Sequence, residues 1–192
     1  LETAAALTAA RRDAAARFER AVTEELGRLA MGSARVLVAV TPVEPGPHGA
    51  DEVEIQLAHP GAAPRSVAKS ASGGELSRLM LALEVVTGAG ALDGRAVPTF
   101  VFDEVDAGVG GVAALHVGAR LAALAAHAQV VVVTHLAQVA AYADRHLVVR
   151  KDDDGAVTSS AVTEVEGAQR LGELARMMGG GASAEGLEHA RV

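Results

Sequence analysis

Residues 98–104 read Pro-Thr-Phe-Val-Phe-Asp-Glu, and residues 130–135 read Val-Val-Val-Val-Thr-His. Each stretch predicts a short apolar strand that ends on side chains able to handle protons, two carboxylates in one case and a histidine in the other. Continuous apolar runs of this length are typical of strands buried on both faces of a parallel sheet. Residues 112–126 between them form an Ala- and Leu-rich helical pattern, so we expect a βαβ unit with a right-handed crossover. The predicted fold class is therefore α/β, with a mostly parallel sheet flanked by helices.

Further helices are predicted at both ends of the chain and before the first strand. Residues 1–31 are rich in Ala, Arg and Glu, with apolar residues at helical spacing, which predicts a long amphipathic helix ended by Gly32. Two explanations of that helix stay open: a surface helix packed on its own domain, or the end of a coiled-coil arm. Other helical patterns cover residues 72–86, 136–142 and 169–178.

Antiparallel strands are predicted in two other places. Residues 36–40 are a β-branched run, and residues 52–57 alternate between polar and apolar, which predicts a half-exposed strand. We expect the proline-rich residues 42–47 to form a loop, and residues 58–70 to form another. Residues 146–150 and 157–162 flank an Asp-rich turn and predict a late β-hairpin.

Composition limits the kind of protein this can be. The chain has 192 residues, 50% hydrophobic but only 2% aromatic, so its core must be built from Ala, Val and Leu. It has no cysteine, which excludes disulfides and thiolate metal sites. The net charge of −7 argues against a free-standing nucleic-acid-binding domain. No apolar run is long enough to span a membrane, and no secretory signal is visible. Because the chain begins within a helical pattern, we expect it to be part of a longer protein.

Asp103 and Glu104 are the first candidates for chemistry. Ligands of open parallel sheets bind beyond the carboxyl ends of the strands. Two carboxylates placed there repel each other unless a cation or a proton intervenes. The natural division of roles is Asp103 toward Mg²⁺ and Glu104 as the base that orients an attacking water. A pair of solvated loop carboxylates is the alternative.

A glycine pair opens the helix that precedes them. Ser72 and Glu75 fit an S-x-x-E capping box, which is a sufficient structural explanation of those two residues. Gly73 and Gly74 need another explanation, because each glycine costs about 1 kcal/mol in a helix relative to alanine. They leave backbone N–H groups open to an anion at the positive end of the helix.

His135 ends the second strand and is predicted to face the same crevice. A lone histidine is more often structural, but at this place it could hydrogen-bond a terminal phosphate. The order of the three motifs outlines half of an ATP-hydrolysing site. The other half is missing, because the phosphate loop G-x-x-x-x-G-K-[ST] does not occur, and the only lysines, Lys69 and Lys151, follow no glycine-rich loop. Residues 108–113 match a dinucleotide fingerprint only by accident, since acidic residues separate them from the strand.

The amino-acid sequences of these motifs resemble those of known ATPases. Residues 72–78 resemble the signature motif of ABC-type ATPases, 100–104 their Walker B strand, and His135 their switch histidine. The longer stretches are similar to the RecN family, bacterial SMC-like proteins of double-strand-break repair. These stretches are residues 71–83, 102–111, 134–140 and 171–180.

The resemblance implies the C-terminal lobe of an ABC/SMC-type ATPase head with a late β-hairpin. Residues 1–31 would be the end of a coiled-coil arm, 32–181 the C-terminal half of the head, and 182–192 a flexible tail. The N-terminal half, with the phosphate loop, would come from another part of the protein. ATP and Mg²⁺ are implied as ligands, DNA as a partner, and the cytoplasm with the nucleoid as the location; no membrane partner is implied.

The resemblance also implies a homodimer in which two heads sandwich two ATP molecules. The partner's nucleotide would be contacted by Ser72, Gly73, Gly74 and Glu75. The nucleotide on the same head would be served by Asp103, Glu104 and His135. Hydrolysis would then require dimerisation, and this chain alone would be inactive.

Two other functions stay open. One is a structural module that tethers DNA or repair proteins without hydrolysis, although intact Ser72 and Glu104 argue against it. The other is the head of a different SMC-like repair ATPase; a transporter subunit is disfavoured because its motifs share one compact domain with the phosphate loop. Many related heads carry an aspartate where Gly110 stands, so residues 106–111 receive no role from the resemblance.

Overall fold

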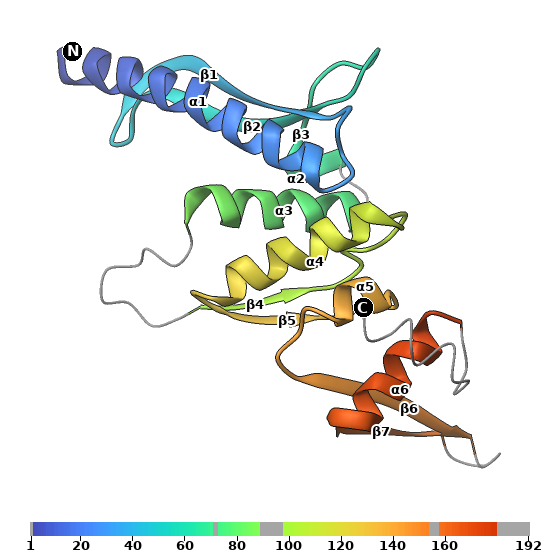
Figure 1. Cartoon of the computed structure of the whole chain (residues 1–192). Coiled ribbons are helices and arrows are strands. Elements are labelled where there is room, and N and C mark those ends of the chain that lie inside the picture. The colour runs from blue at the N-terminus through green and yellow to red at the C-terminus, as the bar shows by residue number, and fades with distance from the viewer. Residues whose placement is uncertain (1, 71–72, 89–97, 154–157, 180–192) are drawn as a thin grey trace.

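The computed structural model describes residues 2–70, 73–88, 98–153 and 158–179, and its elements lie in successive layers (Figure 1). Helix α1 and a three-stranded antiparallel sheet form one end, and α3 and α4 lie between that end and a parallel strand pair. The elements are α1 (Glu2–Arg28), β1 (Arg35–Gly46), β2 (Gly49–Ala58), β3 (Arg65–Ser66), α2 (Val67–Ser70), α3 (Gly73–Thr87), β4 (Thr99–Phe102), α4 (Val112–Ala125), β5 (Gln129–Val132), α5 (Ala137–Ala140), β6 (His146–Asp153), β7 (Thr158–Val165) and α6 (Gly167–Met177).

Helix α1 packs on strands β1 and β2. Its apolar residues Val22 and Leu26, and Leu29 just beyond its end, are fully buried and belong to the main core, as their helical spacing predicts. The predicted helix is therefore confirmed over residues 2–28, and its burial is that of a helix packed on its own domain. Its role as the end of a coiled-coil arm stays a prediction.

The end of α1 differs from the prediction by several residues. The helix ends at Arg28 and not at Gly32, because Ala30 adopts a left-handed φ of 59°. The N–H of Met31 then donates to the carbonyl of Leu26 at 3.0 Å, which satisfies one of the last helical carbonyls. A left-handed turn of this kind usually uses glycine, and the sequence pattern offered Gly32 instead.

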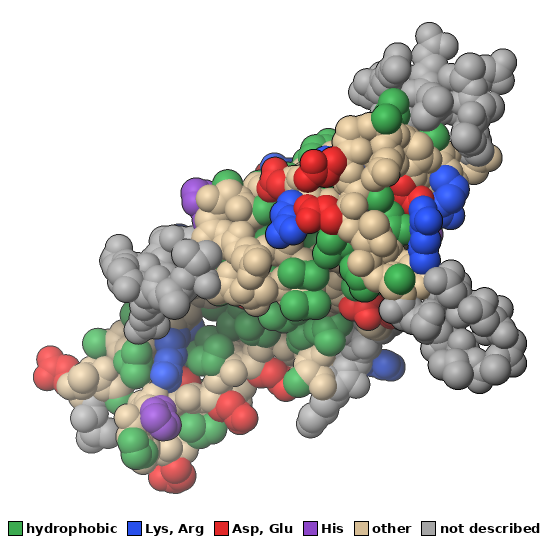
Figure 2. Space-filling model, turned by 90° about the horizontal axis from the view of Figure 1, so that it is seen from below, with side chains coloured by type: hydrophobic (Ala, Val, Ile, Leu, Met, Phe, Trp, Pro, Cys, Tyr) green, Lys and Arg blue, Asp and Glu red, His purple; other side chains and the backbone are tan. Residues whose placement is uncertain are grey.

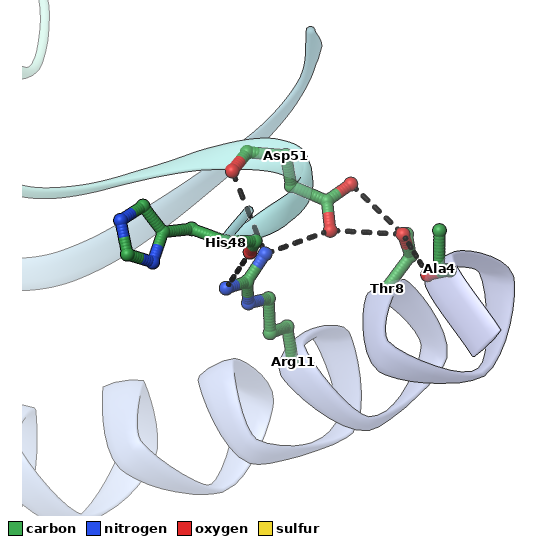
Figure 3. Close-up of polar contacts among 5 residues, drawn as sticks. All are labelled: Ala4, Thr8, Arg11, His48 and Asp51. Carbon is green, nitrogen blue, oxygen red and sulfur yellow. Dashed lines mark hydrogen bonds and ion pairs between the residues drawn. The ribbon is translucent and has the colours of Figure 1, made fainter. Parts of the chain in front are cut away.

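The first half of α1 is tied to the tip of the β1–β2 hairpin (Figure 3). The Asp51 carboxylate, whose side chain is only 2% exposed, accepts hydrogen bonds from Thr8 Oγ1 at 2.8 Å and from Arg11 Nη1 at 3.2 Å. Arg11 Nη2 also donates to the carbonyl of His48 at 2.7 Å. A buried carboxylate is costly unless donors surround it, so this cluster holds the hairpin against the helix.

Strand β1 is longer than predicted. It continues through Pro42 and Pro45 to Gly46, whereas the prolines predicted a loop over 42–47. The pairing with β2 is irregular between Pro42 and Gly46, and β1 is an edge strand, which are the two settings where a sheet tolerates proline. The half-exposed strand over 52–57 is confirmed as part of β2, while the predicted loop over 58–70 contains β3 and α2.

The βαβ unit is confirmed. Strands β4 and β5 are parallel and joined through α4, and α3 and α4 lie over one of their faces (Figure 1). Their buried residues form one core with those of α1; this core includes Leu79, Leu81, Phe102, Val117 and Leu121. The buried Glu25 of α1 pairs with Arg120 of α4, which links the two layers.

Among the described strands, parallel pairing occurs in β4–β5, and the antiparallel pairs are those of the two regions where antiparallel strands were predicted. The expectation that the parallel strands are buried on both faces is wrong, because Val101 and Val133 are 69% and 58% exposed. Helices cover only one face, and Figure 2 shows hydrophobic side chains gathered on the opposite side of the molecule.

The late β-hairpin is confirmed as β6 and β7, followed by α6. Arg170 of α6 donates to the carbonyls of Ala141 and Ala143 at 3.0 and 2.6 Å, which fastens the end of α5 to α6. The predicted tail over 182–192 and the turn at 154–155 lie outside the described residues. Among the helices that the structure describes, none is both long and apolar enough to cross a bilayer.

Candidate functional site

The carboxyl ends of β4 and β5 lie at the same edge. Phe102 pairs with Val132, and the N–H of Val133 donates to the carbonyl of Phe102 at 2.9 Å. The segments that follow, Asp103-Glu104 and Thr134-His135, therefore leave the sheet side by side. This convergence is what the two apolar runs predicted.

Asp103 and Glu104 are both exposed at the start of the loop. Glu104 has a φ of 57°, in the left-handed region that non-glycine residues seldom occupy. The N–H of Ala107 donates to the carbonyl of Glu104 at 3.0 Å, so the chain turns immediately after the carboxylate. Backbone conformations of this kind concentrate at functional sites, where surrounding contacts hold them.

Asp106 connects the two strand ends, and the sequence had assigned it no role. It is 3% exposed. Its Oδ2 accepts a hydrogen bond from the Thr134 hydroxyl and another from the His135 N–H at 3.0 Å, and it lies 3.2 Å from His135 Nδ1. The available signal was an acidic residue in the turn after one strand, together with Thr-His after its neighbour.

His135 points away from the protein at the same edge. Its side chain is 73% exposed, although its backbone N–H and its Nδ1 both face Asp106. The Thr134 hydroxyl also accepts a hydrogen bond from the N–H of Leu136 at 3.1 Å, which fixes the turn that carries the histidine. The prediction that His135 shares an edge with the Asp103 strand is confirmed.

The start of α3 packs against the loop that follows β4. A Cβ on Gly74 would lie 2.8 Å from Cβ of Ala107, and a Cβ on Gly73 would lie 2.5 Å from Oε2 of Glu104. Gly74 is therefore needed sterically within this chain, an explanation that the sequence analysis did not consider, whereas the Glu104 side chain can move away from a Cβ on Gly73. Ser72 lies outside the described residues.

Ser77 and Arg78 fasten α3 to the same loop, and sequence reasoning missed both. Ser77 Oγ donates to the carbonyl of Asp103 at 2.6 Å. Nη1 of the buried Arg78 donates to the carbonyls of Val105 and Ala107, at 3.3 and 2.7 Å. Burial lowers the pKa of Arg78, against the opposing effect of nearby carboxylates. Their position one turn after the glycine pair is the only sequence signal for this contact.

Glu75 is half-buried on α3, and its Oε1 lies 3.9 Å from Nε2 of His59 in the segment that follows β2. The carboxylate therefore lies near the three-stranded sheet.

The described residues contain no group of three or more His, Asp or Glu side chains arranged to hold a metal ion, so Mg²⁺ at the predicted ligand Asp103 would need further ligands from water and phosphate. Magnesium usually keeps several waters and binds one or two carboxylates together with substrate phosphates. A single exposed carboxylate at a strand end fits that requirement.

The fold is that of an SMC-type ATPase head. The chain is similar to the SMC head domain with coiled coil and joint of Pyrococcus yayanosii, with a TM-score of 0.57 and 19% identity over 84% of this chain and 29% of the other. It is also similar to an SMC ATPase studied for ATP-driven dimerization and DNA-stimulated activation, with a TM-score of 0.50 and 18% identity over 89% of this chain and 97% of the other. No model of a known protein family matches the chain.

The amino-acid sequence is similar to known DNA repair proteins over most of its length. The chain is 58% identical to the DNA repair protein RecN of Streptomyces coelicolor, over 92% of its own length and 33% of that protein. It is 48% identical to RecN of Mycobacterium leprae, over 96% of its own length and 34% of that protein. The chain spans about one third of the length of these relatives. The matched region is the C-terminal part of those proteins, and the predicted resemblance to RecN is confirmed.

Proposed function

We propose that this chain is the C-terminal half of an ATP-binding and ATP-hydrolysing head, that two such heads dimerise around ATP, and that the protein acts in DNA double-strand-break repair. The observation that carries the proposal is the joint built at the ends of β4 and β5. Asp106 ties Thr134 and His135 to the turn that holds Asp103 and Glu104. The similarity to RecN supports the role in repair.

The exposed carboxylates of Asp103 and Glu104 have separate roles in this proposal. Asp103 directs a carboxylate oxygen toward Mg²⁺, which would neutralise charge on the phosphates. Glu104 accepts a proton from the attacking water and orients it. Because its backbone is held in a left-handed turn, its side chain starts from a fixed place beside the start of α3. His135 hydrogen-bonds the terminal phosphate.

The start of α3 serves the nucleotide of a second head. Gly73 is exposed at the end of a 15-residue helix, whose N-terminus favours negative charge. Ser72 would add its hydroxyl, and Gly74 and Glu75 would complete the contact. Ser77 and Arg78 fasten this helix to the loop that carries Asp103. The residues that would contact the partner's nucleotide and those that would serve the nucleotide on the same head are therefore held together.

The missing half of the head would cover the bare face of β4 and β5. Val101, Val131 and Val133 are exposed at 69%, 44% and 58%, and these strands pair only with each other in the described residues. Apolar exposure of this kind marks an interface. An N-terminal half with the phosphate loop would pack there. DNA as a partner and a nucleoid-associated, cytoplasmic location follow from the same proposal.

Glu104→Gln in the full-length protein tests the proposal. We expect ATP turnover to fall by about 10²–10⁴-fold, the range for loss of a general base, while ATP-driven dimers persist. Turnover is measured by phosphate release and dimerisation by light scattering. This chain without its N-terminal half should hydrolyse ATP negligibly, because most of the triphosphate charge has no partner.

Glu44→Gln is the matched control, since Glu44 is exposed on β1 in the layer that carries α1. It should leave both turnover and dimerisation unchanged. Unchanged turnover in Glu104→Gln would reject the catalytic assignment. ATP-dependent dimers of the wild-type protein without any turnover would instead favour the tethering module.

A further inference from the structure

Asp106 is buried although it lies only two residues beyond the exposed Glu104. The contacts described for its Oδ2 come from two successive residues: the Thr134 hydroxyl, the His135 N–H at 3.0 Å and His135 Nδ1 at 3.2 Å. A carboxylate inside a protein is costly unless donors compensate for the lost water. The Thr134 hydroxyl and the His135 N–H supply that compensation, and Nδ1 of the histidine lies 3.2 Å from the same oxygen.

This contact decides which nitrogen of His135 is available. An ionised carboxylate only accepts hydrogen bonds, so a hydrogen bond between Nδ1 and Asp106 requires the proton on Nδ1. Nε2 would then be the nitrogen left for another partner. The ring has Nδ1 3.2 Å from Asp106, and 73% of the side chain is exposed.

We infer that Asp106 is a positioning residue for His135: it selects the Nδ1–H form of the imidazole and holds Nε2 toward the terminal phosphate of ATP. The inference rests on the proposed function, because that function places the phosphate beyond His135. Without the carboxylate, an exposed histidine would rotate among its side-chain rotamers and would populate both neutral forms. Only part of that population could meet the phosphate correctly.

A purely structural role is the rival explanation. The same carboxylate oxygen accepts from the Thr134 hydroxyl and from the His135 backbone, so Asp106 could act only by holding two loops together. A loss of activity in a variant does not separate the two roles. The separation requires a measurement in which the imidazole itself is observed or removed.

A double-mutant cycle in the full-length protein supplies one such measurement. Single-turnover ATP hydrolysis is compared in wild type, Asp106→Asn, His135→Ala and the double variant. We expect Asp106→Asn to slow hydrolysis by about 10–100-fold, the usual range for a residue that orients a functional histidine. The affinity for a fluorescent ATP analogue should change by less than about twofold, and the double variant should be no slower than His135→Ala. Thr134→Val, which removes a donor to the same carboxylate but keeps the imidazole contact, is the control and should lose less.

Nitrogen NMR of histidine-labelled full-length protein observes the ring directly. The His135 signal is identified by its absence in His135→Ala. In the wild-type protein at pH 8 we expect Nδ1 to be protonated and Nε2 not, and we expect Asp106→Asn to shift the population toward Nε2–H. This measurement in the wild type depends on no variant that could fail to fold.

The outcomes are distinguishable from failure of the proposed function. Slower hydrolysis in Glu104→Gln and His135→Ala, with an Asp106→Asn effect that persists in the His135→Ala background, would overturn the inference and leave the proposed function standing. An Nε2–H form in the wild type would also overturn it. Unchanged hydrolysis in both Glu104→Gln and His135→Ala would overturn the proposed function and the inference together.

Discussion

The layer of α1, β1 and β2 and the layer of β4, α4 and β5 are built in opposite ways. In the first, the chain supplies both sides of the contact, and Val22, Leu26 and Leu29 have no exposure at all. In the second, helices cover one face of a two-stranded sheet, and Val101 and Val131 remain open on the other. The candidate site lies in the second layer. In the proposed function, the half-covered layer is the one that the N-terminal half of the head completes.

The largest expected effect comes from truncating one apolar side chain in each layer and comparing the loss in free energy of unfolding. Leu26→Ala should lower the free energy of unfolding by roughly 2–5 kcal/mol, since it removes buried methyl groups and leaves a cavity. Val131→Ala, on the bare sheet face, should change it by less than about 0.5 kcal/mol. Urea unfolding measures both variants. An equal loss in the two would show that the sheet face is already covered in this chain.

Arg78→Ala tests how firmly the site itself is held. The change removes the donor to the carbonyls of Val105 and Ala107, and we expect a loss of roughly 1–3 kcal/mol from unsatisfied buried groups. Amide hydrogen exchange should rise in residues 103–107 and stay unchanged in β1 and β2. Arg65→Ala, at an exposed arginine of β3, is the control. Exchange that rises evenly through the chain would mean that the loop has no separate support.

Asp51→Ala has the smallest expected effect and tests the first layer. We expect a loss of about 1 kcal/mol, because the carboxylate is buried but its partner Arg11 is partly exposed and screened by water. Asp51→Asn should keep the contact with Thr8 and lose less. Hydrogen exchange should rise in the first turns of α1 and not near Leu26. Unchanged exchange in that segment would contradict a stabilising contact between Asp51 and the first half of α1.

Much of the fold follows from hydrophobic patterns. The run at 99–102 was predicted to the residue, because Pro98 and Asp103 bound it on both sides. The common edge of Asp103 and His135 followed from parallel pairing alone. Burial on both faces was predicted incorrectly, because an apolar run does not tell whether the described chain covers each face of the strand.

The contacts within the site were harder to predict. Asp103, Glu104 and Asp106 are equally acidic in the sequence, and only the approach of Thr134 from a neighbouring strand decides that Asp106 turns inward. The glycine pair was predicted from its chemistry toward anions, yet the steric need for Gly74 comes from Ala107 and the backbone of Glu104, which lie about thirty residues away. Local sequence patterns do not reveal contacts between residues so far apart in the chain.

The hydrogen-bonded cluster around Asp51 has a consequence for how helix α1 can move. Helix α1 has 27 residues, which at 1.5 Å per residue is about 40 Å of length. It is gripped near Thr8 by the hairpin tip and near Leu26 by the core, so it cannot bend freely between these two points. Because the helix moves as a rigid body, a tilt of about 5° at its buried C-terminal end displaces its N-terminal end by roughly 3 Å. Small rotations of α1 at the core would thereby produce larger displacements at its N-terminal end.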